Sequence, residues 1–215
     1  MRKLVVNTFA SLDGVMQAPG GPEEDPTGGF ELGGWSVPFW DDRMGQVMSE
    51  FMGKPFDIIL GRKTYEIFAA YWPHSDQSGA AELNRATKYV ASRTLESLDW
   101  ENSTLLQGDV GEAVARLKKE EGPELQVHGS SDLIQTLLRH DLVDEFRVWI
   151  FPVVLGSGKR LFGEGAPPRT LKLVDSQVSS TGVVMATYQP GGDVKPGSFA
   201  LEEPTEAELR RRESL

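Results

Sequence analysis

Apolar residues along the first 150 positions follow two alternating patterns. Continuous apolar runs of about four to eight residues are typical of buried strands, whereas apolar residues recurring at roughly every third or fourth position are typical of amphipathic helices. The continuous runs predict strands over residues 4–9, 56–60, 88–91, 104–106, 124–127 and 144–151. The spaced pattern predicts helices over residues 41–52, directly after 61–64, over 110–117 and over 133–138, while residues 72–86 indicate loop or loose helix.

Two later runs, residues 171–178 and 183–188, meet near Thr181 and Gly182 and predict a closing antiparallel hairpin. Strands that alternate with helices are typical of a parallel sheet covered on both faces. The sequence therefore predicts an α/β fold of three layers, with a mostly parallel central sheet and an antiparallel C-terminal hairpin. We expect one domain over residues 1–190 and a polar tail over residues 191–215 that is mobile or docks in a dimer, with a short helix near residues 206–212.

Residues 11–38 break the regular pattern, because they contain seven glycines and four prolines. Long loops inside a compact domain are usually lids, binding loops or disordered segments. Trp35 and Trp40 close this stretch and could line a pocket for a flat heterocycle, with core packing plus one exposed tryptophan as the alternative.

Composition limits the classes of function. The 215 residues include no cysteine, which excludes disulfides, thiol catalysis and cysteine-ligated zinc; we expect no metal site. The net charge of −10 disfavours nucleic acid and anionic membranes as partners. No apolar run approaches the roughly 18 residues needed to cross a bilayer, so we expect a cytoplasmic protein.

Three predicted turns that follow strands carry phosphate-binding chemistry. They are Gly61-Arg62-Lys63-Thr64, Ser92-Arg93-Thr94 and His128-Gly129-Ser130-Ser131. Exposed N–H groups at a helix start favour phosphates, and arginine suits bidentate phosphate recognition. Together, Arg62, Lys63 and Arg93 predict a pocket for the 2′-phosphate of NADP. The alternatives are a solvated basic pair and an ordinary polar turn, and His128 is either a ligand contact or a variant turn residue.

These turns also carry a family resemblance. Residues 60–66 and 90–95 are similar to the cofactor turns of dihydrofolate reductases. Residues 10–14, 127–130, 142–145 and 152–158 resemble the C-terminal reductase domain of the bifunctional riboflavin-biosynthesis deaminase/reductase. The resemblance covers about residues 2–190 and implies a stand-alone reductase of the dihydrofolate-reductase-like superfamily, with the deaminase half missing.

The resemblance also implies an activity. It points to a homodimeric, NADPH-dependent oxidoreductase that transfers a hydride to a small pyrimidine- or pteridine-like substrate, similar to 5-amino-6-(5-phosphoribosylamino)uracil reductase. A true dihydrofolate reductase and a non-catalytic nucleotide-binding homodimer are the alternatives. Among the matched residues, Ala10 in the first strand and the three turns are expected to bind the cofactor.

Hydride transfer needs a proton source beside the cofactor. Asp13 follows the first strand, beside the expected nicotinamide site, and Glu145 stands where the similar domain carries an acid. We predict both as catalytic; the alternatives are a plain Asp-Gly turn residue and an edge-strand carboxylate. Trp35, Trp40 and Asp42 are predicted to contact substrate, with helix capping as the alternative for Asp42.

Overall fold

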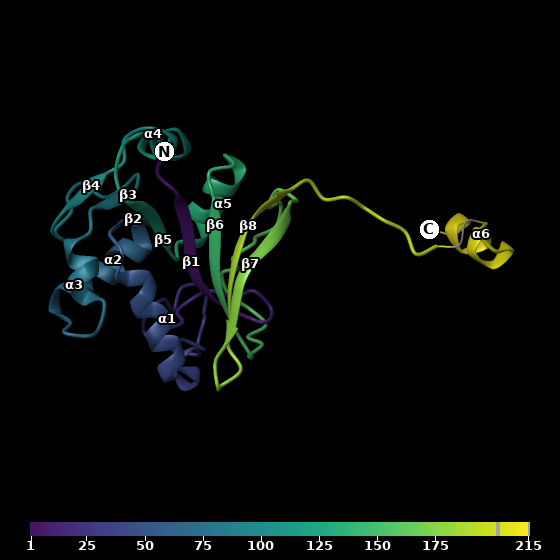
Figure 1. The fold of residues 1–215 in the computed structure, drawn as a ribbon, viewed down its shortest axis with the longest axis horizontal. Coiled ribbons are helices and arrows are strands. Elements are labelled where there is room, and N and C mark those ends of the chain that lie inside the picture. Colours follow the sequence, from purple (N-terminus) through teal and green to yellow (C-terminus); the bar gives the residue numbers. More distant parts are fainter. Residues whose placement is uncertain (201–202, 215) are drawn as a thin grey trace.

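The computed structural model describes residues 1–200 and 203–214. One eight-stranded sheet forms its centre, with the strand order β4-β3-β2-β5-β1-β6-β8-β7 (Figure 1). The strands are β1 (Leu4–Ser11), β2 (Phe56–Gly61), β3 (Lys88–Ala91), β4 (Ser103–Leu105), β5 (Glu124–His128), β6 (Glu145–Phe151), β7 (Thr170–Val178) and β8 (Val184–Gly192). Strands β1 to β6 are parallel to one another, whereas β8 is antiparallel to both of its neighbours, β6 and β7. The predicted α/β fold with a mostly parallel sheet and an antiparallel C-terminal pair is confirmed.

Helices cover both faces of this sheet. They are α1 (Asp42–Met52), α2 (Arg62–Tyr71), α3 (Ala80–Arg85), α4 (Val110–Lys119) and α5 (Ser131–Arg139), with 3-10 turns at Val37–Phe39 and Trp72–His74. Leu4 of β1 packs in a cluster with Ile134 of α5 on one face. Trp149 of β6 packs with Met44 of α1 on the other. Successive strand residues point to opposite faces of the sheet. Because helices cover both faces, the central strands are largely apolar along their length.

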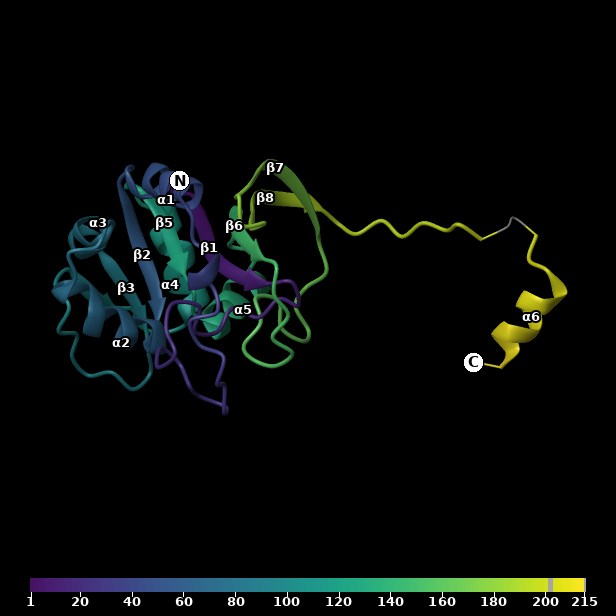
Figure 2. The same cartoon turned by 90° about the horizontal axis from the view of Figure 1, so that it is seen from below.

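The tail leaves the body beyond the hairpin. Figures 1 and 2 show α3 at one end of the body and the β7–β8 pair at the other, with the chain leading away to α6 (Glu206–Glu213). The Thr205 side chain accepts a hydrogen bond from the Glu208 amide and caps this helix where the sequence predicts one. Residues 201, 202 and 215 of the predicted tail lie outside the described residues. Among those described, no helix is long and apolar enough to cross a bilayer.

The irregular segment 12–38 is tied to the body through Gln17, which is buried. The Gln17 amide nitrogen donates to the carbonyls of Asp25 and Thr27, at 2.9 Å each. Its amide oxygen accepts from the Lys159 amide at 3.0 Å, and its backbone carbonyl accepts from the Trp35 indole at 2.8 Å. One side chain therefore fixes two parts of the loop against the segment after β6.

Gly33 lets this loop fold back on itself. A Cβ at this position would come within 2.8 Å of the Pro22 Cα and even closer to the Gly21 carbonyl oxygen, which are backbone atoms that cannot step aside. We expect Gly33→Ala to destabilise the protein by about 1–3 kcal/mol, the usual effect of overpacking. Urea unfolding would measure this.

A matched glycine of α1 supplies the control. A Cβ on Gly45 would meet nothing within 4 Å, so Gly45→Ala is expected to stabilise by about 0.5–1 kcal/mol. Equal effects of the two substitutions would show that the close approach at Gly33 carries no energetic weight.

Candidate functional site

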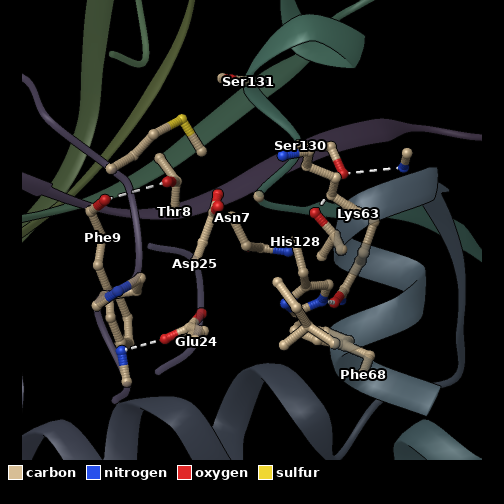
Figure 3. A pocket seen from close by; sticks show the side chains of 18 of the residues that line it. Asn7, Thr8, Phe9, Glu24, Asp25, Lys63, Phe68, His128, Ser130 and Ser131 are labelled. Atoms are coloured by element: carbon tan, nitrogen blue, oxygen red, sulfur yellow. Dashed lines mark hydrogen bonds between the residues drawn. The ribbon is translucent and has the colours of Figure 1, made fainter. Parts of the chain in front are cut away.

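One large cleft lies at the edge of the sheet where β3, β2, β5 and β1 end. These four strands are consecutive in the sheet and mutually parallel, so the turns that follow them lie side by side. The cleft is lined by those turns, by part of the segment 16–25 and by residues of α1. Figure 3 shows Lys63, Ser130 and His128 on one side of it, and Phe9 and Glu24 on the other.

All three predicted phosphate turns reach this cleft, since residues 61–64, 92–94 and 128–131 belong to its lining. Ser130 joins two of them. Its hydroxyl accepts from the Gly61 amide at 2.9 Å and donates to the Thr64 hydroxyl at 2.6 Å. A Cβ on Gly61 would lie only 3.0 Å from that hydroxyl, so glycine is what lets the first and third turns meet.

The third turn has an unusual backbone. Gly129 and Ser130 follow each other with φ of 77° and 69°, in the left-handed region. Ser130 has a Cβ, so this conformation costs about 1 kcal/mol or more, and such outliers cluster at ligand sites. Turns of this kind leave successive N–H groups unpaired and pointing one way, which suits an anion at the start of α5.

Positive charge gathers around these turns despite the acidic net charge. Arg62, Lys63 and Arg93 are exposed on the cleft. Arg62 pairs with Glu66 one turn along α2 at 3.0 Å, an exposed contact worth only a few tenths of a kcal/mol, roughly. The guanidinium is therefore free to turn to a phosphate, which would bind it more strongly.

His128 ends β5, and its side chain lies on the cleft face of the sheet beside Gln126. Its ring nitrogen Nε2 lies 2.7 Å from the Gln126 amide oxygen. Burial, followed by the nearby positive charge of Arg147, lowers the pKa of His128 to about 4. The imidazole is therefore neutral at pH 7 and adds no charge to the phosphate turns.

Asn7 lies at the centre of the cleft floor. Its neighbours across the sheet are His128 on β5 and Arg147 on β6, and all three residues line the cleft. The side-chain nitrogen and oxygen of Asn7 are buried, and neither has a hydrogen-bond partner among the described residues. An unmet buried amide costs about 1–3 kcal/mol. Such a group in a cleft is what a ligand with matching donor and acceptor would satisfy.

Arg147 is held by two carboxylates beneath that floor. It makes a bidentate pair with Glu124, at 2.8 and 2.9 Å, and donates to Glu145 at 3.0 Å. Its guanidinium also lies 4.7 Å from the centre of the Phe51 ring. Because two acids surround this one base, Arg147 presents little net positive charge to the cleft.

Glu145, a predicted catalytic acid, serves this network at the opposite end of the strand. It opens β6, pairs with Val5 across the sheet, and is absent from the cleft lining. Burial alone would raise the pKa of Glu145, but hydrogen bonds from Lys3 and Gln189 and the charge of Arg147 bring it below its ordinary value. The structure thus gives Glu145 an ion-pairing position and not one beside a reacting ring.

Asp13, the other predicted acid, also lies outside the cleft lining. Its carboxylate accepts from the Ser11 hydroxyl at 2.6 Å and from the amides of Leu155 and Gly156, at 3.1 and 2.8 Å. The Ser11 and Leu155 hydrogen bonds lead the causes that lower the pKa of Asp13 to about 2. A carboxyl that is ionised throughout the neutral range and already bonded to a loop positions that loop; it is a poor proton donor.

This role gives Asp13→Asn a pH signature. The folded pKa of about 2 lies below the ordinary 3.8, so the carboxylate stabilises the fold above pH 3.8 and loses this contribution as the pH falls through about 2. We expect the variant to be less stable than the wild type at pH 7, with a gap that narrows from pH 4 downward. Urea unfolding at pH 7, 4 and 3 measures the gap, and exposed Asp76→Asn is the control. A gap independent of pH would contradict the assignment.

Aromatic rings form the other wall of the cleft. Phe9 and Trp149 are neighbours across β1 and β6, with ring centres 5.2 Å apart in a stacked arrangement. Trp40 lies 5.8 Å from Trp149 and is about half exposed. Phe9, Trp40 and Trp149 all line the cleft, as does Asp42 at the start of α1. Trp40 and Asp42 therefore lie where a substrate bound in the cleft could contact them.

Two further predicted residues are placed elsewhere. Trp35 is buried, packs edge-on against Phe151 at 5.3 Å and does not line the cleft. Ala10 is buried in the cluster on the α5 face of the sheet and does not line the cleft. For Trp35 the core-packing alternative therefore holds.

Asn7, Phe9, Glu24, Arg147 and Trp149 are among the cleft residues that were not predicted from the sequence. Asn7 and Arg147 were detectable in principle, because each interrupts an apolar strand with a polar side chain. Glu24 lies among the glycines and prolines of the irregular segment, where the sequence carries no structural signal.

Comparisons with known proteins agree with this architecture. The family model of the RibD C-terminal domain matches residues 2–185. The uncharacterized protein YyaP of Bacillus subtilis is 30% identical over 196 residues, which cover 89% of this chain and 96% of that protein. A second uncharacterized protein of that organism, YwjB, is 29% identical over 178 residues, 80% of this chain and 89% of its own length.

Solved structures share the fold at lower identity. A putative riboflavin biosynthesis protein from Shewanella has a TM-score of 0.59 at 19% identity, over 87% of this chain and 98% of its own. A pyrimidine reductase-like protein from Corynebacterium diphtheriae has a TM-score of 0.58 at 14% identity, over 89% and 93%. A dihydrofolate reductase from Enterococcus faecalis, complexed with NADP(H) and RAB-propyl, has a TM-score of 0.56 at 14% identity, over 88% of this chain and 96% of its own. These likenesses confirm the dihydrofolate-reductase-like fold.

Proposed function

Since the chain belongs to the RibD C-terminal domain family, we propose that it is an NADPH-dependent reductase of a small pyrimidine- or pteridine-like ring. The observation that carries the proposal is that three turns suited to binding phosphate line one cleft. The same cleft has an aromatic wall and the buried Asn7 amide, which has no hydrogen-bond partner among the described residues. A solved relative in fold is described as pyrimidine reductase-like, and another binds NADP(H). Both descriptions are consistent with this activity.

The residues present fit a dinucleotide phosphate. The left-handed pair Gly129 and Ser130 presents N–H groups at the start of α5 for a pyrophosphate. Arg62 and Arg93 would hold the 2′-phosphate that distinguishes NADPH from NADH. When bound, the reduced nicotinamide supplies the hydride, while the protein orients both rings and supplies a proton.

The floor and wall of the cleft favour a flat, uncharged substrate. Trp40 and Phe9 offer ring faces for stacking. His128 is neutral at pH 7, and the charge of Arg147 is balanced by its two carboxylates. The Asn7 amide can both donate and accept, which matches the –CO–NH– edge of a pyrimidine or pteridine ring.

Binding and turnover test the proposal. NADPH titrated against the purified protein, followed by its fluorescence, is expected to bind at least about tenfold more tightly than NADH, since one charge-assisted phosphate contact is worth about 1.5–3 kcal/mol. A panel of pyrimidines and pteridines, assayed by the fall in NADPH absorbance, then identifies the ring. A protein that binds neither dinucleotide would refute the proposal.

A dihydrofolate reductase activity is the second candidate. Asp42 favours it, because this acid begins α1, is exposed and lines the cleft. The panel therefore includes 7,8-dihydrofolate. Turnover of this compound that is lost in Asp42→Asn, with NADPH binding retained, would select this candidate over the first.

A further inference from the structure

We propose that Glu24 is the acid that delivers the proton to the substrate, an inference that rests on the reductase function proposed above. Glu24 lines the cleft from the loop 12–38. Figure 3 shows it beside Phe9 and across the pocket from Lys63 and Ser130. The phosphate turns would hold the 2′-phosphate end and the central pyrophosphate of an extended dinucleotide, so we place its nicotinamide end beyond them, on the side of the cleft where Glu24 stands.

The other carboxyls of the cleft lining either accept hydrogen bonds that fix them in place or lie exposed. Asp25 pairs with Lys159 and accepts from the Thr27 hydroxyl at 2.5 Å. Asp41 caps α1 and also accepts from Ser180, and Asp109 caps α4. The remaining acids of the lining lie exposed on its rim, namely Glu23, Asp42, Glu50 and Asp132. Glu24 is half-buried and pairs with no cation among the described residues, and unlike Asp41, whose two oxygens both accept hydrogen bonds, it uses only one of its oxygens.

The local contacts of Glu24 hold it in place and leave one oxygen available. Its Oε2 accepts from the amides of Gly20 and Gly21, at 2.6 and 3.2 Å, whereas Oε1 makes no hydrogen bond to a described residue. Burial raises the pKa of Glu24, the two amides partly oppose this, and the neighbouring charge of Asp25 adds to the rise. The charge of Asp25 is itself offset by Lys159 from the segment after β6. A raised pKa means that this carboxyl holds its proton more readily than an ordinary glutamate does, which suits a general acid.

The proposed step balances as a two-electron reduction. The nicotinamide supplies a hydride to the carbon of a C=N bond in the substrate ring. The π electrons of that bond pass to nitrogen, which forms an N–H bond as the O–H bond at Oε1 of Glu24 breaks. The ring gains two hydrogens, the cofactor leaves oxidised, and the Glu24 carboxylate takes a proton from solvent before the next cycle.

Carboxyl titration by NMR tests this placement without any substrate. Protein labelled with ¹³C at the glutamate carboxyls is titrated alone, with saturating NADPH and with saturating NADP⁺. Glu24→Gln identifies the Glu24 signal by its loss, and keeps an oxygen to accept from Gly20 and Gly21. We expect the signal to titrate above ordinary glutamates in the free protein. We also expect its pKa to be about 1 unit lower with NADP⁺ than with NADPH, because only the oxidised ring carries a positive charge and a nearby cation favours the carboxylate.

The exposed neighbour Glu23 is the matched control, and its signal, assigned by Glu23→Gln, should titrate alike in both complexes. Equal titration of Glu24 in the two complexes would overturn the inference while leaving the reductase proposal intact, because the nicotinamide would then lie elsewhere. Failure of both nucleotides to bind would instead overturn the function on which the inference rests.

Discussion

Replacing Arg62 and Arg93 together by alanine is expected to weaken NADPH binding about 100-fold or more, and NADH binding less than about threefold. Both guanidinium groups stand exposed on the turns that follow β2 and β3, which are neighbouring strands. Each charge-assisted phosphate contact contributes about 1.5–3 kcal/mol, and NADH lacks the phosphate that these residues would bind. The selective loss is therefore the signature of a 2′-phosphate site.

Fluorescence titration of both dinucleotides measures this selectivity. Arg116→Ala is the matched control, since Arg116 pairs with Glu112 one helical turn away, as Arg62 pairs with Glu66, but lies on α4 outside the cleft lining. It should leave both affinities unchanged. Equal weakening of NADPH and NADH in the double variant would mean that the arginines contact a part common to both, and the assignment of the 2′-phosphate would fail.

The positions of most strands and helices could be anticipated because the signals that mark them are local in the sequence. Residues 4–6 and 58–60 form apolar runs because they are buried on both faces of the sheet, and the polar turns after residues 60 and 91 mark where their strands end. Parallel neighbours bring those turns to one edge. The convergence of the phosphate turns thus follows from sequence periodicity and topology together.

The acids could not be placed in this way. Asp13 reads as a residue beside the nicotinamide, but its carboxylate is occupied by amides 142 and 143 residues away in the chain. Glu145 occupies a family position whose surroundings here include Lys3 and Arg147. Trp35 faces the core because Gln17 accepts from its indole. Each placement depends on long-range contacts of irregular segments, which no periodicity reports. The homodimer and the cytoplasmic location stay predictions.

The ion network beneath the cleft carries the other large expected effect. Arg147→Met is expected to lower the free energy of unfolding by about 3 kcal/mol at pH 8, because removing the cation leaves the largely buried Glu124 without its ion-pair partner and leaves Glu145 with Lys3 alone. Methionine retains much of the packing against Phe51, which separates the loss of charge from the loss of contact.

The pH dependence identifies the cause. In the wild type the folded pKa of Glu145 is lowered, so its carboxylate stabilises the fold above the ordinary value of 4.5 and that contribution fades as the pH falls through the folded pKa. In Arg147→Met the Glu145 carboxylate keeps Lys3 and Gln189 but loses the charge of Arg147, so its pKa rises relative to that of the wild type and protonation relieves part of the lost compensation. The loss of unfolding free energy in Arg147→Met should therefore be smaller at pH 5 than at pH 8 when it is measured by urea unfolding. The control Arg116→Met, at an exposed position, should change the unfolding free energy by less than about 0.5 kcal/mol at both pH values. An equal loss of unfolding free energy at both pH values would mean that Arg147 stabilises the protein through packing, and that its ion pairs contribute little.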